Sequence, residues 1–201
     1  MLPKALLDTI DALGRLPGVG PRTAERYAYF LFRSNPTISE TISDTLKNLH
    51  KSLKSCPKTF ALIDADKEVS EFYSDPARDR TSVLVVEEPL DIYAIESTKQ
   101  YSGTYHVLGG AISPIDGITP DQLHIKELVS RISDDSVKEV IIATNPSVEG
   151  ESTALLIQKL LSEKFPDLTL TRLARGLPLG VDLSYADQIT LSAALSNRTN
   201  L

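Results

Sequence analysis

The sequence predicts a mixed α+β chain in four parts: a helical N-terminal unit, a small β module, an α/β domain with a mainly parallel sheet, and a C-terminal helical tail. Apolar residues recur at helical spacing through the first part. From Thr81 onward, short β-branched runs alternate with helical segments, an order that indicates parallel strands joined by helical crossovers. The stretch between these parts carries no helical stripe. We therefore expect boundaries at residues 1–53, 54–79, 80–173 and 174–201.

The N-terminal unit, residues 1–53, is expected to contain three helices. A Gly/Pro cluster separates the first two, and Asn35-Pro36 ends the second. Each helix carries apolar residues at the spacing of one helical face. These stripes are Leu2, Leu6, Ile10 and Leu13; Ala24, Tyr27, Ala28 and Leu31; and Ile38, Ile42, Leu46, Leu49 and Leu53.

The middle stretch, residues 54–79, favours a short β-hairpin or a compact loop module. Its aromatic and β-branched residues are interrupted by Pro57 and Pro76 and follow no helical period. We expect Asp64-Ala65-Asp66 to lie at the turn of the hairpin.

The α/β domain and the tail follow from alternating apolar runs. We expect strands at residues 82–86, 105–108, 140–143 and 168–173, and helices through Ile92 and Ile95, over 121–133 and over 151–164. Leu123, Leu128 and Ile132 should face inward from the helix over 121–133. The tail adds a Gly/Pro-rich loop and a final helix from Tyr185 to Leu195.

The charge of the 201-residue chain is uneven along its length. The formal net charge is −6, yet residues 1–55 hold eight Lys/Arg and five Asp/Glu, a balance of +3 that leaves −9 for the rest. Contact with a polyanion is therefore expected at the N-terminal end, although ordinary scatter of charge would give the same balance. The single cysteine, Cys56, excludes an internal disulfide and fits a reducing compartment. No apolar run approaches the roughly 20 residues that span a bilayer, so we expect a cytoplasmic protein.

A Gly/Pro hairpin joins the first two expected helices, with the sequence Leu16-Pro17-Gly18-Val19-Gly20-Pro21-Arg22. Gly18 and Gly20 permit a tight turn and close backbone approach, and the free amides of the following helix can hold a phosphate oxygen. Arg22, Arg26 and Arg33 follow at i, i+4 and i+11, on one helical face. The string resembles a helix-hairpin-helix motif, which implies DNA binding without sequence readout. The alternative is a plain helix turn with solvated arginines.

Acidic residues follow two expected strands. Glu87 and Glu88 follow the first strand, and Glu149 and Glu151 follow the third. Carboxylates at such strand ends can hold Mg²⁺ for phosphoryl chemistry, and the layout resembles the Toprim domain of topoisomerases and primases. The Asp-x-Asp of that domain is replaced by Asn145-Pro146-Ser147, so we expect at most a weak Mg²⁺ site and no catalytic residues. The alternative for Glu149 and Glu151 is a favourable helix N-terminus.

Several motifs in order resemble the bacterial RecR family of recombination mediators. They are Ser74–Arg80, Val85–Pro89, His106–Gly110, Ile112–Pro114, Gly117–Ile118, Ala143–Pro146, Glu149–Glu151 and Ala174–Pro178. The resemblance implies a non-enzymatic DNA-repair clamp and scaffold that acts with RecO and RecF to load recombinase on gapped or single-stranded DNA. It also implies homodimers and ring-like tetramers whose contacts come from the helix-hairpin-helix and C-terminal segments. Carried over, Arg22 and Arg26 would face DNA, and Glu87, Glu88, Glu149 and Glu151 would form a partner-facing acidic surface.

The family's four-cysteine zinc element is degenerate in this chain. Cys56 holds the first ligand position, whereas Thr59, Ser70 and Tyr73 hold the other three. Structural zinc takes four nitrogen or sulfur ligands, so we expect no zinc. We expect apolar packing instead, from Phe60, Leu62, Ile63, Val69, Phe72 and Tyr73. The alternative for Phe72 and Tyr73 is base stacking.

The tail segment Gly176–Leu183 resembles the family's C-terminal motif. No Gly-x-x-x-x-Gly-Lys-Ser/Thr loop occurs in the chain, so we interpret the tail as a packing or subunit-exchange segment and not as a nucleotide site. Three functions stay open on the sequence. They are a DNA clamp and scaffold, a Mg²⁺-dependent Toprim nuclease or primase-like enzyme, and a partner scaffold that has lost DNA contact.

Overall fold

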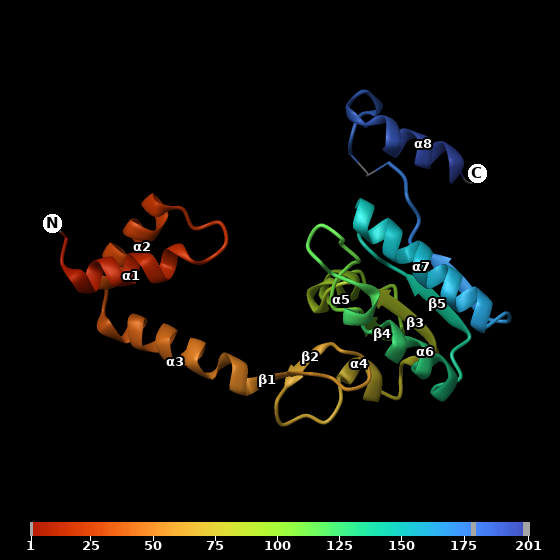
Figure 1. The fold of residues 1–201 in the computed structure, drawn as a ribbon, viewed down its shortest axis with the longest axis horizontal. Coiled ribbons are helices and arrows are strands. Elements are labelled where there is room, and N and C mark those ends of the chain that lie inside the picture. The colour runs from red at the N-terminus through yellow and green to blue at the C-terminus, as the bar shows by residue number, and fades with distance from the viewer. Residues whose placement is uncertain (1, 178–179, 199–201) are drawn as a thin grey trace. The chain divides into compact units, whose positions relative to one another are not determined.

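The computed structural model describes residues 2–177 and 180–198, drawn as a ribbon in Figure 1. The chain forms two compact units, residues 1–54 and residues 55–201. The first is mainly helical, and the second contains the four-stranded sheet. This mixed architecture confirms the predicted fold class.

The N-terminal unit consists of α1 (Lys4–Gly14), α2 (Pro21–Arg33) and α3 (Pro36–Ser52). α1 and α2 pack together over Ala24 and Ala28, the two fully buried side chains of α2. Tyr27, expected to face inward with them, is 43% exposed. The side chain of Asn35 caps α3 by accepting a hydrogen bond from the Thr37 amide.

The apolar stripe of α3 is uncovered. Its members within the helix are each more than a third exposed: Ile38, Ile42, Leu46 and Leu49. Their helical period was predicted correctly, but Leu53, expected to continue the stripe, lies in the strand that follows the helix. Within the described part of the chain no side chain of α3 is buried. This face is therefore available for another surface.

The 54–79 module begins with β1 (Leu53–Ser55) and β2 (Leu62–Asp64), which form a two-stranded sheet, and ends with α4 (Glu71–Ser74). The chain turns at residues 56–61, where the Phe60 amide donates to the Cys56 carbonyl and Phe60 adopts a φ of +59°. The prediction that Asp64-Ala65-Asp66 forms the hairpin turn is wrong. Those residues turn after β2, where the Lys67 amide donates to the Asp64 carbonyl.

The α/β domain has a four-stranded parallel sheet in the order β4-β3-β5-β6. The strands are β3 (Asp79–Val86), β4 (Gly103–Val107), β5 (Glu139–Ile142) and β6 (Thr169–Arg172). The helices are α5 (Pro89–Glu96), α6 (Ile125–Asp134) and α7 (Val148–Lys164) (Figure 1). Each predicted strand is present, and the predicted mainly parallel pairing is confirmed.

The helix predicted over residues 121–133 is divided. A 3-10 turn, η1 (Pro120–Gln122), precedes α6. Between them Leu123 is extended, and the His124 amide donates to the carbonyl of Leu108 at the end of the second predicted strand. α7 begins at Val148, three residues earlier than expected, because the Ser147 hydroxyl caps it at the Gly150 amide.

The core lies on both faces of the sheet. On one face, Val83 and Val85 pack with the inward residues of α6 and α7, including Leu128, Ile132 and Ile157. On the other face, Leu84, Val86, Tyr105 and Val107 pack with Ile92 of α5 and with Ala61 of the module. Leu123, Leu128 and Ile132 are buried as predicted. The module therefore covers part of one sheet face.

The tail contains η2 (Leu183–Tyr185) and α8 (Gln188–Ser196), capped by the Asp187 carboxylate at the Thr190 amide. The expected helix starts at Gln188 and not at Tyr185. Residues 178–179 of the predicted C-terminal motif, and residues 199–201, lie outside the described residues. No helix among the described residues has the length and apolar character needed to cross a membrane.

Candidate nucleic-acid interface and acidic strand ends

The hairpin between α1 and α2 has the geometry of a tight, open turn. The Leu16 amide donates to the Leu13 carbonyl, and the Val19 amide donates to the Leu16 carbonyl. Gly18 adopts a φ of +77°, which disfavours any residue with a side chain. Gly20 has a φ of −77° and is the N-cap of α2. A Cβ at Gly20 would meet no atom within 4 Å, so another molecule can approach the backbone there.

The N-terminus of α2 lacks a side-chain cap among the described residues. Pro21 occupies its first turn, and the Gly20 carbonyl accepts the Thr23 and Ala24 amides. Since the first amides of a helix carry partial positive charge, an uncapped start next to an open glycine suits an anion.

The three predicted arginines are exposed on α2. Arg26 lies 5.7 Å over the ring of Tyr27, and Arg33 lies 5.8 Å over the ring of Tyr29. In residues 2–177 and 180–198, none of Arg22, Arg26 and Arg33 forms an ion pair with a carboxylate. Within this part of the chain, therefore, no carboxylate offsets their charge.

An apolar groove of about 460 Å³ lies in the same unit. It is lined by Pro3, Ala5, Leu6, Thr9, Ala28, Tyr29, Leu31, Phe32 and Ser39. Phe32 is 78% exposed, and Tyr29 and Phe30 are more than half exposed. Together with the α3 stripe, the groove leaves much apolar surface in contact with water.

Glu87 is the carboxylate at the end of β3, and it is buried, with 6% of its surface exposed. Its Oε1 accepts the backbone amide of Asn145 at 2.9 Å, and its Oε2 accepts the Asn145 side-chain amide at 2.6 Å. A Cβ at Gly150 would lie 2.7 Å from Glu87 Oε1 and 2.2 Å from the Asn145 carbonyl oxygen. The start of α7 therefore closes this corner of the sheet, and only glycine fits there.

The other three predicted carboxylates differ in their surroundings. Glu88 is exposed and caps α5, while its own amide donates to Asp91 at 2.8 Å. Glu149 is half-buried in the first turn of α7. Glu151 accepts two hydrogen bonds from Arg172, at 2.9 and 3.0 Å, and one from Arg175. These contacts, from Arg172 and then Arg175, lower the pKa of Glu151 to about 2.

The expectation that all four carboxylates form one exposed acidic surface is corrected by this arrangement. Glu87 is buried because Asn145 and Gly150 cover it, and the charge of Glu151 is offset by two arginines. Among the residues that the structure describes, neither Glu88 nor Glu149 pairs with an arginine or a lysine. Sequence reasoning missed Arg172 and Arg175, because nothing local relates them to Glu151.

Cys56 is fully buried at the turn of the module. Its Sγ accepts the backbone amides of Lys58 and Thr59, each at 3.5 Å, and that of Ser70 at 3.3 Å. Burial raises the pKa of the thiol, but hydrogen bonds from Thr59, Lys58 and Ser70 outweigh burial and leave the pKa below its usual value. The described residues contain no group of three or more His, Cys, Asp or Glu side chains arranged to hold a metal ion.

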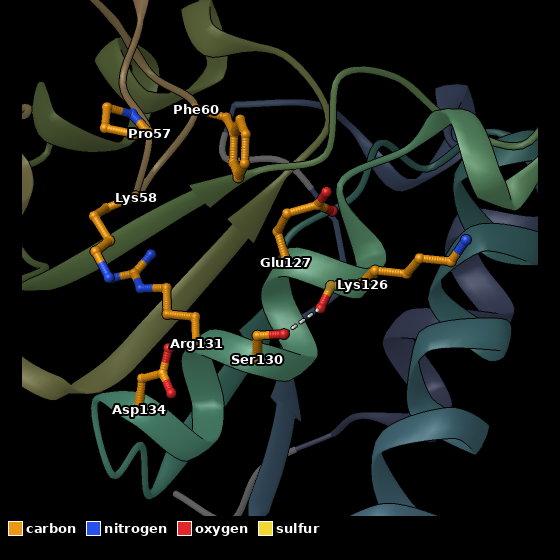
Figure 2. Close-up of a pocket in the computed structure, with 8 residues that line it drawn as sticks. All are labelled: Pro57, Lys58, Phe60, Lys126, Glu127, Ser130, Arg131 and Asp134. Carbon is orange, nitrogen blue, oxygen red and sulfur yellow. Dashed lines mark hydrogen bonds between the residues drawn. The ribbon is translucent and has the colours of Figure 1, made fainter.

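A second cavity, of about 250 Å³, lies between the module and α6 (Figure 2). Pro57, Lys58, Phe60, Lys126, Glu127, Ser130, Arg131 and Asp134 line it. Arg131 is already engaged, because it donates to the Tyr105 carbonyl and the Thr104 hydroxyl and pairs with Asp135. The lining mixes both signs of charge and selects no ligand class.

Comparison with known proteins gives three family matches along the chain. Residues 7–50 match the helix-hairpin-helix model of RecR, residues 81–174 match the Toprim domain, and residues 176–199 match the C-terminal model of RecR.

Full-length relatives give the same result. The chain is 46% identical over 198 residues to Recombination protein RecR of Rhodococcus jostii (strain RHA1), with 96% of each chain covered. It is 48% identical over 199 residues to that of Moorella thermoacetica (strain ATCC 39073 / JCM 9320), covering 99% of this chain and 98% of the relative. Identity to that of Acidothermus cellulolyticus (strain ATCC 43068 / DSM 8971 / 11B) is 45% over 201 residues, covering 100% and 99%.

Proposed function

The chain belongs to the RecR family of recombination proteins, and we propose that it works in recombinational DNA repair as a non-enzymatic DNA-binding clamp and scaffold. Membership itself supports a role in recombinational repair. The observation that carries the clamp is the hairpin, where an uncapped helix start lies beside arginines that pair with no carboxylate among the described residues. A chain acting on bacterial DNA in this way works in the cytoplasm.

DNA contact is proposed for Gly18, Gly20, Arg22, Arg26 and Arg33. The open Gly20 lets a phosphate reach the first amides of α2, and Arg22 and Arg26 add charge on the next turn. In this arrangement the backbone amides and the guanidinium groups contact phosphate oxygens, and such contacts carry no sequence information, so binding should tolerate any sequence.

A scaffold role is favoured over Toprim chemistry by the Glu87–Asn145 pair. Metal-dependent phosphoryl transfer needs carboxylate oxygens that are free to bind Mg²⁺. Both oxygens of Glu87 already accept hydrogen bonds from Asn145, and Gly150 leaves little room beside them. A Mg²⁺ ion would have to displace Asn145, and neither Asn145 nor Ser147 brings a compensating charge.

Partners are proposed on two kinds of surface. Glu88 and Glu149 leave a small acidic surface at the strand ends, which suits a basic partner such as a RecO-like or RecF-like repair protein. The apolar groove and the α3 stripe suit further copies of this chain, in dimers or ring-like tetramers. The net charge of +3 over residues 1–55 should bind DNA only weakly in a single chain. Several chains in one assembly would contact the same DNA together, and their combined binding would be much tighter.

The hairpin is tested by replacing Arg22 and Arg26 with alanine in the full chain. Binding to labelled single-stranded and gapped DNA is measured by fluorescence anisotropy across a salt series, and assembly is followed by sedimentation. Loss of two phosphate contacts should weaken binding by about tenfold or more and reduce the salt slope by about 2.

The matched control removes the same charge elsewhere, by replacing Lys138 and Lys159, both exposed, with alanine. Equal binding by the arginine variant and the native chain, with assembly unchanged, would disprove the hairpin assignment. Mg²⁺-dependent cleavage or synthesis that is lost on Glu88→Gln would instead establish a Toprim enzyme.

A further inference from the structure

We propose that the 54–79 module folds without zinc and is held in place by docking onto the α/β domain, with Cys56 Sγ serving as a hydrogen-bond acceptor where a metal-bound thiolate would lie. This proposal concerns how the fold is held together and does not depend on the proposed DNA contact.

The side chains at the zinc positions do not fit the metal. Zn²⁺ in structural sites takes four thiolate or imidazole ligands, and here Thr59, Ser70 and Tyr73 offer only hydroxyl groups. Thr59 and Ser70 are nevertheless buried beside Cys56, at 0% and 2% exposure. The Thr59 hydroxyl accepts the Ala61 amide, and the Ser70 hydroxyl caps α4 at the Phe72 amide. These hydroxyl groups therefore satisfy neighbouring backbone amides.

Cys56 joins the two ends of the module. The amides of Lys58 and Thr59 come from its own turn, whereas the Ser70 amide comes from a segment 14 residues away. A thiol is a weak acceptor, so three such bonds cannot replace the free energy of structural zinc binding. Further stabilisation must come from outside the module.

The first docking contact is aromatic. The rings of Phe72, in α4, and Tyr105, in β4, pack edge to face with centroids 5.4 Å apart. The guanidinium group of Arg78 lies 5.1 Å from the centroid of the Phe72 ring. Arg78 also donates two hydrogen bonds to Glu96 of α5, at 2.9 and 2.7 Å. Its side chain is only 15% exposed, so this pair is well shielded from water.

The second contact uses the fourth zinc position. Tyr73 donates its hydroxyl to Asp135 Oδ1 at 2.9 Å, just after the end of α6. The guanidinium of Arg80 lies 4.9 Å from the ring centroid, and that of Arg131 lies 5.3 Å from it. The residue that would close a zinc site therefore attaches the module to the α/β domain.

The third contact continues the sheet. The Val107 amide of β4 donates to the Thr59 carbonyl at 2.8 Å, and Phe60 stacks on His124 with centroids 3.7 Å apart and planes inclined by 10°. Since β4 is an edge strand, the turn of the module covers part of its free edge. Phe72 and Tyr73 are half-buried in these contacts, which argues against the base-stacking alternative.

Zinc is tested on the full chain purified from zinc-supplemented cells. Elemental analysis should find far less than one zinc per chain, and thermal unfolding should be the same with and without a strong chelator. Near-stoichiometric zinc, or a melting temperature that falls with chelator, would overturn the zinc-free module.

Docking is tested by hydrogen exchange of residues 56–61 in Tyr73→Phe and Phe72→Leu. Tyr73→Phe removes only the hydrogen bond to Asp135. Amide exchange of residues 56–61 should then become roughly fivefold faster, which corresponds to a decrease of about 1 kcal/mol in the free energy of local opening. Tyr185→Phe, at a residue that is 83% exposed, is the matched control. Unchanged protection of residues 56–61 in both module variants would overturn the docking proposal.

Discussion

Asn145 donates two hydrogen bonds to Glu87, one from its backbone amide at 2.9 Å and one from its side-chain amide at 2.6 Å. The two residues lie at the ends of neighbouring strands, β5 and β3. The pair satisfies a buried carboxylate without a metal and fixes the loop that leads into α7. The backbone and side-chain amides of Asn145 thus hold together the corner of the sheet for which the sequence suggested at most a weak Mg²⁺ site.

Replacing Asn145 with alanine should destabilise the protein by about 2 kcal/mol, because the buried carboxyl group of Glu87 then loses the side-chain amide that donates to its Oε2. Urea denaturation at neutral pH measures the free energy of unfolding. Asn48→Ala, on the exposed surface of α3, is the control and should be neutral. An Asn145→Ala protein as stable as the native chain would show that Glu87 does not need this donor.

The Glu87–Asn145 pair also shows what the sequence could predict and what it could not. The strands follow from local runs such as Val83–Val86, and the hairpin follows from its glycines and prolines. The partners of Glu87 lie 58 residues further along, and only the pairing of β3 with β5 brings them together. The stripe of α3 was likewise predictable, whereas its exposure was not, because periodicity does not say what covers a face.

The two hairpin glycines should respond differently to alanine. Gly18→Ala forces a φ of +77° on a residue with a Cβ and should cost about 1 kcal/mol of folding stability. Gly20→Ala is compatible with its φ of −77° and open surroundings, so stability should be unchanged while the added methyl group impedes a phosphate. Thermal unfolding and DNA anisotropy separate the two effects.

Each hairpin variant is the control for the other. Gly20→Ala should bind DNA several-fold more weakly than the native chain although it melts at the same temperature. Native-like DNA binding by Gly20→Ala would place the phosphate contact elsewhere, and equal stability of both variants would contradict the turn geometry.

Cys56 should be a buried structural thiol. Because it is fully buried, a thiol reagent should modify it only when the module opens, even though its pKa lies below the usual value. Cys56→Ala removes the acceptor of three amides and should cost about 2 kcal/mol, whereas Cys56→Ser retains an acceptor and should cost less. Labelling of the native protein as fast as that of the urea-unfolded chain would contradict this arrangement.

His106 should make stability depend on pH. Burial lowers the pKa of its imidazole to about 3 and outweighs the hydrogen bond that Nε2–H donates to the His124 carbonyl at 2.7 Å. The other ring nitrogen, Nδ1, has no partner among the described residues. Below the ordinary pKa of histidine the unfolded chain binds a proton that the folded chain does not, so stability is full above that value and falls as pH decreases toward about 3. The loss should approach about 1.4 kcal/mol per pH unit, the value for one bound proton, in the lower part of this window.

The test measures the free energy of unfolding from neutral pH down to about pH 5, which stays above the ordinary pKa values of Asp and Glu. His106→Phe loses a hydrogen bond and should be less stable at neutral pH, but its stability should fall less steeply with acid. His50→Gln, at an exposed residue of α3, is the control and should keep the native slope. The slope of the unfolding free energy against pH is the readout, because the lost hydrogen bond changes the stability of His106→Phe at every pH. If this slope is the same in His106→Phe as in the native chain, other groups account for the acid sensitivity.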